Sequence, residues 1–503
     1  MTANDEKVLS EFPFPTLRQL CVERIVHDIE HIVEGMDFDE LANPRNSYIL
    51  GPFSCLDPDS IRRIWKYLLE INKISKAWLS LLIVPHLRVC ILPSSLSTSL
   101  RLVHTRCHQL TKLSLYQSGP ATISTELVCQ VIQLNLGLQK VHMNHIFEGK
   151  RCMDKVISTL AHCCPELAVL DIPNNSISKP MVLEELCGSV EICGCRDLIE
   201  LNLEFVNLEC SESVMISLMK GLKSLQILNI CGTFLNIHKV WEILLKESIA
   251  LDLTELDVSC LNVTGDVFTH IGLLHPNIHK LNCLDTSFFE GMKQDFNFPN
   301  IHDLAIATPN DDRSILRLND IITKVGNNLT RLHIGNYCGY PTVTWNIIIK
   351  NCPNLEHLDL FYCRINTPPD DQVTLVLNDH CPKMSVLILN RTEIKINKRT
   401  VVGHYGTILG PCQQLKKLQA HGTSMVEVDL ITIFSNLCIN RIQILELSHT
   451  DVSTDSVIQV LVVAPCLKRI NLCGCKRVDS QGYAVLKSRA SEPRRVHPQI
   501  LWE

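Results

Sequence analysis

Cysteine is the residue type with the widest chemistry in this sequence, because thiolates bind metals, form disulfides and act as nucleophiles. The chain has 24 cysteines among 503 residues. Two close pairs, Cys193-Gly-Cys195 and Cys473-Gly-Cys475, are each separated by a single glycine. A zinc site normally uses Cys-x-x-Cys pairs, with a second pair at a defined distance. The spacing therefore argues against zinc, and we expect neither a metal nor another cofactor.

The other reactive side chains form no recognisable catalytic motif. The sequence has no Gly-x-Gly-x-x-Gly, no P-loop, no Gly-x-Ser-x-Gly elbow and no His-Glu-x-x-His. We therefore predict a protein that is not an enzyme. Five of its histidines fall at outward positions in or beside expected strands, where we expect solvated side chains or, alternatively, a pH-sensitive patch: His142, His279, His302, His333 and His357.

Charge and hydropathy exclude other classes of function. The formal net charge is −6, which disfavours a general nucleic-acid-binding protein. The first residues, MTANDEKVLSEF, lack the basic-then-apolar pattern of a signal peptide, and no apolar run approaches the ~18 residues that span a bilayer. We expect no nucleic-acid partner, no membrane partner, reduced thiols, and a location in the cytoplasm, the nucleus or both.

Several cysteines belong to a sequence motif that recurs along the chain and marks its structural repeats. Cys164-Pro-Glu-Leu167, Cys352-Pro-Asn-Leu355 and Cys381-Pro-Lys-Met384 each precede an apolar-x-x-apolar-x-apolar segment. Such segments recur on average about every 27 residues, close to the period of leucine-rich repeats. They start at fourteen positions: Leu110, Leu138, Leu167, Leu198, Leu225, Leu253, Ile278, Ile301, Leu329, Leu355, Met384, Leu415, Ile442 and Leu467.

Each unit reads as a short strand followed by a helix. Leu358 and Leu360 alternate with polar residues as a strand requires, while Val457, Val460 and Leu461 have helical spacing. Small side chains able to form hydrogen bonds recur three residues after the last strand leucine, where the chain must turn. They are Ser118, Asn175, Thr233, Thr286, Cys363, Thr392, Thr423, Thr450 and Cys475.

These phrases resemble the cysteine-containing subclass of leucine-rich repeats. The resemblance implies an α/β solenoid, or horseshoe, of about 14 repeats with parallel strands on its concave face and helices outside. We assign residues 105–485 to this solenoid, residues 1–104 to a small all-helical domain, and residues 486–503 to a C-terminal tail.

The N-terminal region begins with an amphipathic helix. Thr16 and Gln19 have capping-box spacing, and Gly35 is a natural stop. An apolar stripe runs along the helix through Leu17, Cys21, Ile25, Ile29 and Ile32. Since the end of a solenoid needs a cover, the simplest interpretation is a cap on the first repeat.

The same segment, residues 16–25, also resembles a BC-box, the helix by which cullin-2 and cullin-5 substrate receptors bind elongin C. The resemblance implies that Leu17 fills a hydrophobic pocket, that Cys21 allows a close approach, and that Ile25 completes the contact. Elongin B would accompany elongin C. A BC-box ahead of leucine-rich repeats is similar to the Zyg-eleven and Zer adaptors, but their armadillo-like domain has no counterpart in the sequence, so their substrate class is not carried over.

Residues 56–82 resemble two different boxes. Asp57 can cap a helix in which Pro58-x-x-Ile61-x-x-x-Trp65 is similar to a cullin-2 box, implying that Pro58, Ile61 and Trp65 contact cullin-2. Asp57 stands where that box has an apolar residue, which leaves cullin-5 open. Alternatively, the same stretch through Leu81 resembles an F-box, which implies a Skp-family adaptor and cullin-1.

We therefore predict a substrate-recognition subunit of an elongin BC-type cullin–RING ubiquitin ligase that binds a protein through its repeats. The alternatives are an F-box receptor of a Skp–cullin ligase and a leucine-rich-repeat scaffold with no ligase link. Candidate substrate-binding residues are the outward charges Glu200, Asp257, Glu356, Asp359, Lys417, Lys468 and Arg469.

Overall fold

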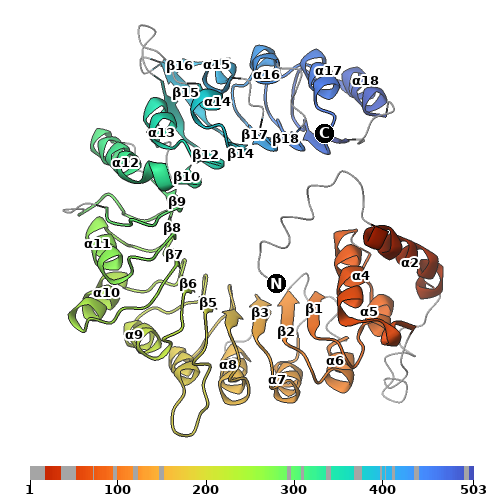
Figure 1. The fold of residues 1–503 in the computed structure, drawn as a ribbon, viewed down its shortest axis with the longest axis vertical. Helices are drawn as coiled ribbons and strands as arrows, with labels where there is room; N and C mark the ends of the chain where they lie inside the picture. The colour runs from red at the N-terminus through yellow and green to blue at the C-terminus, as the bar shows by residue number, and fades with distance from the viewer. Residues whose placement is uncertain are drawn as a thin grey trace. The chain divides into compact units, whose positions relative to one another are not determined.

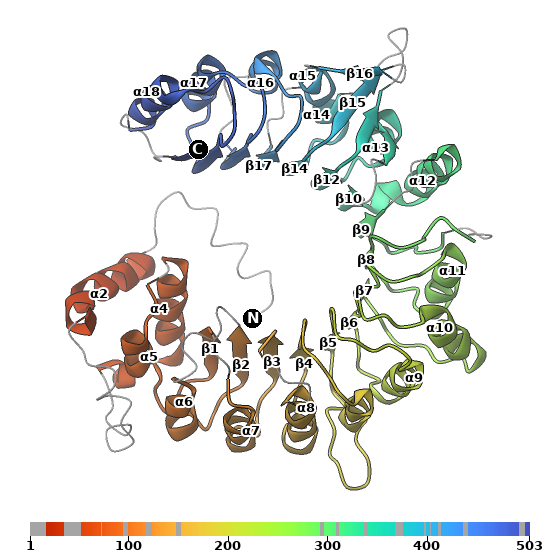
Figure 2. The ribbon, with the colours of Figure 1, turned by 180° about the vertical axis from the view of Figure 1, so that it is seen from behind.

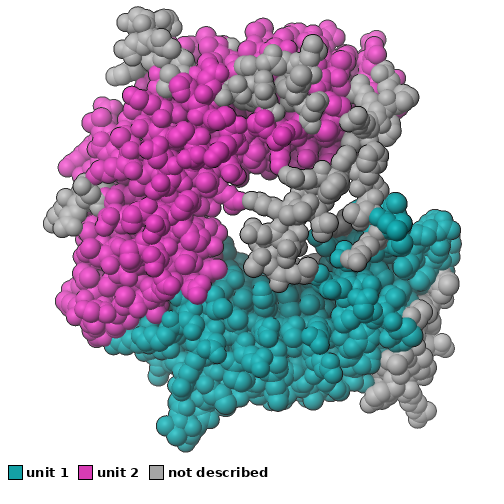
Figure 3. Space-filling model, in the orientation of Figure 1, with its two compact units in different colours: residues 1–225 teal, residues 226–503 magenta. Residues whose placement is uncertain are grey.

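The computed structural model falls into two compact units, residues 1–225 and residues 226–503, which we describe separately (Figure 3). It describes residues 17–34, 52–71, 73–93, 99–116, 123–146, 152–291, 296–307, 311–335, 341–367, 376–396, 399–402, 404–410, 414–435, 441–491 and 498–502.

Unit 1 begins with a group of helices held together by capped ends and apolar faces. They are α2 (Leu17–Glu34), η1 (Pro52–Cys55), α4 (Pro58–Glu70) and α5 (Lys76–Leu82). The side chain of Asp57 caps α4 by accepting hydrogen bonds from the backbone amides of Asp59 and Ser60, both at 3.0 Å. Arg106 joins α5 to the repeats, since its guanidinium donates to the carbonyl oxygens of Ser80 (2.7 Å) and Ile83 (3.1 Å).

The remainder of unit 1 alternates parallel strands with helices. The strands are β1 (Val89–Pro93), β2 (Lys112–Tyr116), β3 (Lys140–Asn144), β4 (Val169–Asp171) and β5 (Glu200–Asn202). The helices are α6 (Leu100–Arg106), α7 (Thr125–Leu134), α8 (Cys152–Cys163), η3 (Pro180–Cys187) and α9 (Glu212–Gly221), and they cover one face of the strands (Figure 1).

Unit 2 continues the same alternation. Its parallel strands are β6 (Ile227–Asn229), β7 (Glu255–Asp257), β8 (Lys280–Cys283), β9 (Asp303–Ile306), β10 (Arg331–Gly335), β12 (His357–Phe361), β14 (Val386–Ile388), β17 (Lys417–Gln419), β18 (Ile444–Glu446), β19 (Arg469–Asn471) and β20 (Gln499–Leu501).

The helices of unit 2 again cover one face of these strands (Figure 2). They are α10 (Ile237–Lys246), α11 (Gly265–Leu274), α12 (Asp312–Val325), η4 (Gly326–Asn328), α13 (Trp345–Asn351), α14 (Leu377–His380), α15 (Tyr405–Leu409), α16 (Glu427–Ile433), α17 (Thr454–Val463) and α18 (Ser480–Ala490). A second sheet contains β11 (Thr342–Thr344), β13 (Arg364–Asn366), β15 (Glu393–Ile396) and β16 (Arg399–Val401).

This is a leucine-rich-repeat solenoid, so the predicted α/β fold class is confirmed. The strands of the main sheet, five in unit 1 and eleven in unit 2, follow one another in chain order within each unit. All fourteen predicted repeat starts are buried, and each lies two residues before a strand, from Leu110 ahead of β2 to Leu467 ahead of β19. Their side chains fill the space between the strands and the helices, which accounts for the regular apolar spacing.

The sheet has two more strands than the repeats that the sequence analysis found. In β1, the buried Cys90 pairs with Leu113 and occupies a position that other repeats give to an aliphatic residue. Strand β20 lies in the segment expected to be a tail, and α18 extends to residue 490. The strands therefore begin at residue 89 and end at residue 501, beyond both boundaries expected for the solenoid, and the region before residue 105 is not entirely helical.

The turns after several of the strands follow a common pattern. The hydroxyls of Thr233, Thr392 and Thr450 donate to the carbonyl oxygen three residues earlier, at 2.8, 2.9 and 2.6 Å. The residue before each of them has a positive φ: Gly232, Arg391 and His449. A left-handed residue followed by a small hydrogen-bonding side chain thus closes the turn. Ser118, predicted at the same position, lies outside the described residues.

Strand β20 is held by the residue that follows it. The indole of Trp502 stacks on the Tyr483 ring, with centroids 4.8 Å apart and planes at 16°. Its Nε1 donates to the carbonyl oxygen of Val478 at 3.0 Å. These contacts fix the segment against α18 and the loop before it, and β20 pairs in parallel with β19.

Candidate interaction surfaces

Helix α2 has apolar residues on two opposite faces. One face packs on α4 and α5 and buries Val26 and Val33 to 3% and 4% exposure. The opposite face leaves Leu17 and Leu20 exposed by 78% and 46%, together with an exposed Cys21. Thus only one of the two faces is covered by the described part of the chain.

The predicted stripe is divided between these faces. Leu17 and Cys21 lie on the exposed face, Ile25 is half-buried between the faces, and Ile29 turns toward the packed side and is half-buried. The exposed Leu20, three residues after Leu17, was not assigned a role, although its spacing places it on the same face. Thr16 and the side chain of Ile32 lie outside the described residues, and the described helix begins at Leu17.

An ion pair fixes how α2 sits on its neighbours. The Lys73 ammonium, in the connection between α4 and α5, lies 2.5 Å from Glu30 Oε1 on α2. The hydrogen bond from Lys73 holds the pKa of the Glu30 carboxyl below its usual value. Lys73 is exposed and Glu30 is half-buried, so this pair orients the helix and contributes little to stability.

The candidate cullin-binding residues occupy the core of the helical group. Ile61 and Trp65 on α4 are 0% and 3% exposed, whereas Pro58 at the first turn is half-buried. The F-box interpretation also relies on an enclosed residue. Trp78 is buried and stacks on Phe53 with ring centroids 6.3 Å apart. The apolar spacing that suggested two docking boxes therefore also builds the interior of this group.

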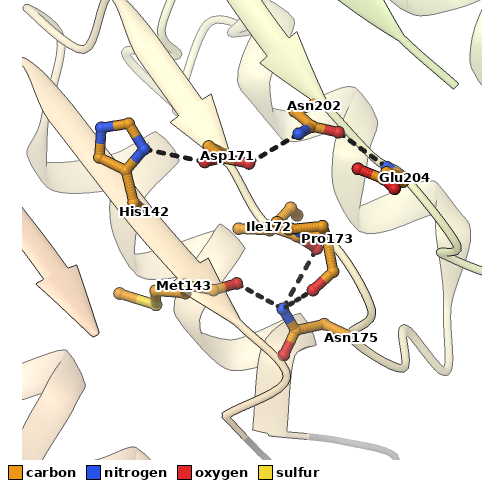
Figure 4. A network of polar contacts seen from close by, with 8 residues as sticks. All are labelled: His142, Met143, Asp171, Ile172, Pro173, Asn175, Asn202 and Glu204. Atoms are coloured by element: carbon orange, nitrogen blue, oxygen red, sulfur yellow. Dashed lines mark hydrogen bonds and ion pairs between the residues drawn. The ribbon is translucent and has the colours of Figure 1, made fainter. Parts of the chain in front are cut away.

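In unit 1, a polar network crosses the strand face (Figure 4). His142 Nδ1 lies 2.9 Å from Asp171 Oδ2, and the Asn202 amide donates to Asp171 Oδ1 at 2.8 Å. The backbone amide of Glu204 in turn donates to Asn202 Oδ1 at 2.9 Å. The network links β3, β4 and β5 side by side, and Glu200 lies half-buried at the start of β5.

In unit 2, one column of outward residues alternates in charge along adjacent strands. Glu255, Lys280, Asp303, Arg331 and His357 occupy successive positions of the register. Lys280 Nζ lies 2.8 Å from Glu255 Oε2, and Arg331 Nη1 lies 3.8 Å from Asp303 Oδ2. Burial raises the pKa of Asp303, although Lys280 and Arg331 oppose the shift. These charges neutralise one another within the sheet.

The neighbouring column contains two of the predicted substrate-binding acids. Asp257 accepts hydrogen bonds from the Ser259 hydroxyl at 2.6 Å and the Asn282 amide at 2.7 Å. Asp359 Oδ2 lies 3.0 Å from His333 Nδ1. Both carboxylates therefore have partners on the sheet, which leaves them less able to accept hydrogen bonds from a ligand.

The other predicted charges are more accessible. The Glu356 side chain is exposed immediately before β12, and Lys468 is exposed immediately before β19. Lys417 is half-buried on β17, and Arg469 on β19 is exposed with its Nε 3.3 Å from Glu446 Oε1. Lys417, Lys468 and Arg469 thus lie at β17 and β19, the two neighbours of β18, apart from the paired acids of β7 and β12.

Two hollows lie among the helices. One of about 620 Å³ is lined mainly by α7 and α8 residues, including Asp154, Lys155 and His162. A more apolar one of about 370 Å³ lies between α16 and α17, lined by Leu430, Phe434 and Val463 among others. In the described part of the chain, no cluster of three or more His, Cys, Asp or Glu side chains could hold a metal. Among the same residues, none of the helices has the length and apolar character to cross a bilayer.

Comparison with known proteins adds likenesses of fold only. No family model and no curated protein matches the chain. A leucine-rich-repeat protein of Leptospira interrogans is 13% identical with a TM-score of 0.41, covering 85% of this chain and 92% of its own. Yeast Rad7, in a complex with Elc1, is 12% identical with a TM-score of 0.39, covering 95% of this chain and 91% of the other.

An internalin of Listeria monocytogenes is 12% identical with a TM-score of 0.35, covering 90% of this chain and 97% of its own. At such identities and scores these likenesses carry no argument about partner or activity. The description as a leucine-rich-repeat protein rests on the register of its own strands.

Proposed function

We propose that this leucine-rich-repeat protein is a substrate-recognition subunit of an elongin BC-type cullin–RING ubiquitin ligase. The observation that carries the proposal is the second apolar face of α2, formed by Leu17, Leu20 and Cys21. A helix that only capped the repeats would need the face of Val26 and Val33 and no other. An additional exposed apolar face at one end of the chain is typical of a binding surface.

The resemblance to a BC-box supplies the partner for this face. A helix presenting Leu17 and Cys21 one turn apart can insert the leucine into a pocket while the small thiol permits close approach. Burying a leucine side chain is worth about 1.5–3 kcal/mol. Losing that contact would thus weaken binding by roughly 10- to 150-fold.

A cullin contact, if α4 makes one, involves the exposed side of that helix. Ile61 and Trp65 are enclosed, so a partner would meet Asp59, Arg62 and Lys66, with Pro58 at the edge. The F-box alternative would need residues around Trp78 that α5 buries. A scaffold without a ligase link remains the alternative in which α2 binds no adaptor.

The test is binding of purified full-length protein to the elongin B–elongin C complex, measured by calorimetry, with a Skp-family adaptor in parallel. We expect elongin C binding that the double variant Leu17→Ala/Cys21→Phe abolishes. The matched control is Leu316→Ala on α12, whose side chain is 64% exposed. Protection of Cys21 from a maleimide in the complex provides an independent reading.

Undiminished binding by the double variant would refute the BC-box assignment. Binding of the Skp-family adaptor alone would replace it with the F-box interpretation, and binding of neither adaptor would leave the scaffold interpretation. Because Leu17 and Cys21 are exposed, the double variant should keep the wild-type melting temperature, which separates lost docking from lost folding.

A further inference from the structure

Four cations gather where β17 and β19 begin. Lys417 and Arg469 are the first residues of β17 and β19, Lys416 and Lys468 immediately precede them, and β18 lies between the two strands. The backbone amide of Gln443, just before β18, donates to the Lys416 carbonyl oxygen at 2.8 Å. The Lys468 amide donates to the Gln443 carbonyl oxygen, also at 2.8 Å. We call these four residues the basic edge.

The basic edge acts as one electrostatic feature. Adjacent strands lie about 4.8 Å apart, so residues in register on β17 and β19 are separated by ~10 Å. A carboxylate midway between the two strands would lie ~5 Å from each, within the Debye length of about 8 Å at physiological ionic strength, so the potentials of the cations overlap where it binds. Overlapping potentials of one sign attract a partner of the opposite sign.

The chain leaves most of this charge unneutralised. Within the described residues, the only ion pair of the basic edge joins Arg469 to Glu446. Lys416, Lys417 and Lys468 have no carboxylate within ion-pair distance there, whereas Lys280 and Arg331 in the preceding repeats both do. The cations of β8 and β10 are therefore paired with carboxylates, whereas three of the four cations of the basic edge are not.

Apolar side chains stand among these cations on the same strand face. Val386 is in register with Lys417, which in turn is in register with Ile444, and Ile444 with Arg469. Both Val386 and Ile444 are half-buried, as is Ile388 at the end of β14. An outward aliphatic residue gains free energy when a partner covers it.

From this alternation we infer that the strand face from β14 to β19 binds an acidic protein segment that also carries aliphatic side chains. The inference deepens the proposed function and rests on it for the identity of that segment as the substrate. Carboxylates of the segment meet the basic edge, and its aliphatic side chains cover Val386 and Ile444. Specificity comes from the charge, since the basic edge attracts such a segment whereas the paired charges of the preceding strands offer it no net attraction.

The same residues disfavour a single-stranded nucleic acid. Binding to single strands normally combines cations with aromatic side chains on which bases stack. The outward positions of β14, β17, β18 and β19 carry aliphatic or polar side chains instead, and Glu446 lies beside Arg469. A phosphate backbone would meet a carboxylate there without the compensation of stacking.

The experiment measures fluorescence anisotropy of labelled probes with the full-length protein. The probes are a peptide of alternating Glu and Leu, its Lys–Leu and Glu–Ser counterparts, and an oligouridine. Peptides of about 12 residues, at ~3.3 Å per residue, are long enough to cross the four strands. We expect the Glu–Leu peptide to bind most tightly, with an affinity that falls as salt is added.

Two variants and a matched control locate the site. Lys417→Glu/Lys468→Glu should weaken Glu–Leu binding by roughly tenfold or more, because it turns two attractions into repulsions. Ile444→Ser should weaken Glu–Leu binding but leave the Glu–Ser peptide unchanged. The control Lys350→Glu/Lys487→Glu makes the same change in charge at exposed positions of α13 and α18 and should change binding by less than about twofold.

Equal losses in the control and the test variant would overturn the inference, as would preferential binding of the Lys–Leu peptide or of oligouridine. Absence of binding by every peptide would also overturn it. The assay contains no adaptor, so its outcome is independent of elongin C binding and separates failure of the substrate class from failure of the proposed function.

Discussion

The thiol of Cys381 donates a hydrogen bond to the backbone carbonyl oxygen of Cys352 at 3.3 Å, across one repeat of unit 2. The same relationship occurs in unit 1, where the Cys195 thiol lies 3.5 Å from the Cys164 carbonyl oxygen. In both pairs the cysteines occupy the position three residues before a repeat start, and Cys164, Cys352 and Cys381 each directly follow the last residue of a helix. The abundance of cysteine is thus partly explained by a small side chain that links successive turns.

Replacing Cys381 with alanine should therefore destabilise unit 2. The change removes the thiol from a site that is 1% exposed and leaves the Cys352 carbonyl oxygen without this donor. We expect the free energy of unfolding to fall by about 1–2 kcal/mol. Urea unfolding measures this, with Cys466→Ala as the control at a half-buried cysteine; an equal effect at both positions would contradict the role of the thiol.

Cysteine reactivity should divide the thiols into two classes. Burial raises the pKa of Cys352 and of Cys381 to about 12, so neither is a thiolate near neutral pH. Cys55 and Cys193 are exposed. A maleimide at pH 7.5 should modify these two rapidly in the native protein and the first two only after denaturation, as peptide mass spectrometry would show. Rapid native labelling of Cys381 would be incompatible with the described packing.

Stability should decrease on mild acidification because of His275. Its side chain is fully buried against Trp241, and burial lowers its pKa below the ordinary value of about 6.5. Between the folded and unfolded pKa values the unfolded chain binds more protons, so the free energy of unfolding rises with pH. The stabilisation is complete above the unfolded pKa and is lost progressively as pH falls below it.

His275→Leu tests this dependence by removing the titrating group. Urea unfolding between pH 7.5 and 5 should show a flatter dependence on pH in the variant than in the wild type. His357 and His421 also have pKa values lowered by burial and account for part of the remaining slope. An unchanged slope would exclude His275 as a contributor.

Substitutions in the N-terminal helices should separate stability from docking. Trp65→Ala removes a side chain that is 3% exposed and should cost about 3–5 kcal/mol of local stability. Leu17→Ala changes an exposed side chain and should cost less than about 0.5 kcal/mol. Hydrogen exchange of α4 amides reports the difference, and comparable exchange in the two variants would place Trp65 outside the core.

The repeats could be predicted from the sequence because the equivalent positions of successive repeats are buried. The position of Leu355 is apolar in every predicted repeat because its side chain is buried, so the spacing of these apolar residues reveals the strands. Strand β1 was missed because Cys90 stands where the pattern expects an aliphatic residue, and β20 because no repeat phrase precedes it. In β1 a buried thiol satisfies the same packing, and in β20 the half-buried Ile500 stands alone, so neither strand produces the pattern.

The surfaces were less predictable, since an apolar residue looks the same whether its own chain or a partner covers it. Ile61 and Trp65 fit a docking pattern but are buried by neighbouring helices. Conversely, Leu17 can be recognised as a surface residue only from the structure, in which Val26 and Val33 form the packed face of α2. The partners of Asp257 likewise depend on strand register, which places Asn282 beside it.

Strand β20, held by Trp502, also bears on self-association. It stands last in the order of the sheet and is only three residues long. A short edge strand offers few unpaired backbone groups to an incoming chain, which limits growth of the sheet by strand addition. A segment that resembles a tail in sequence thus forms a short strand that leaves few backbone groups for another chain to pair with.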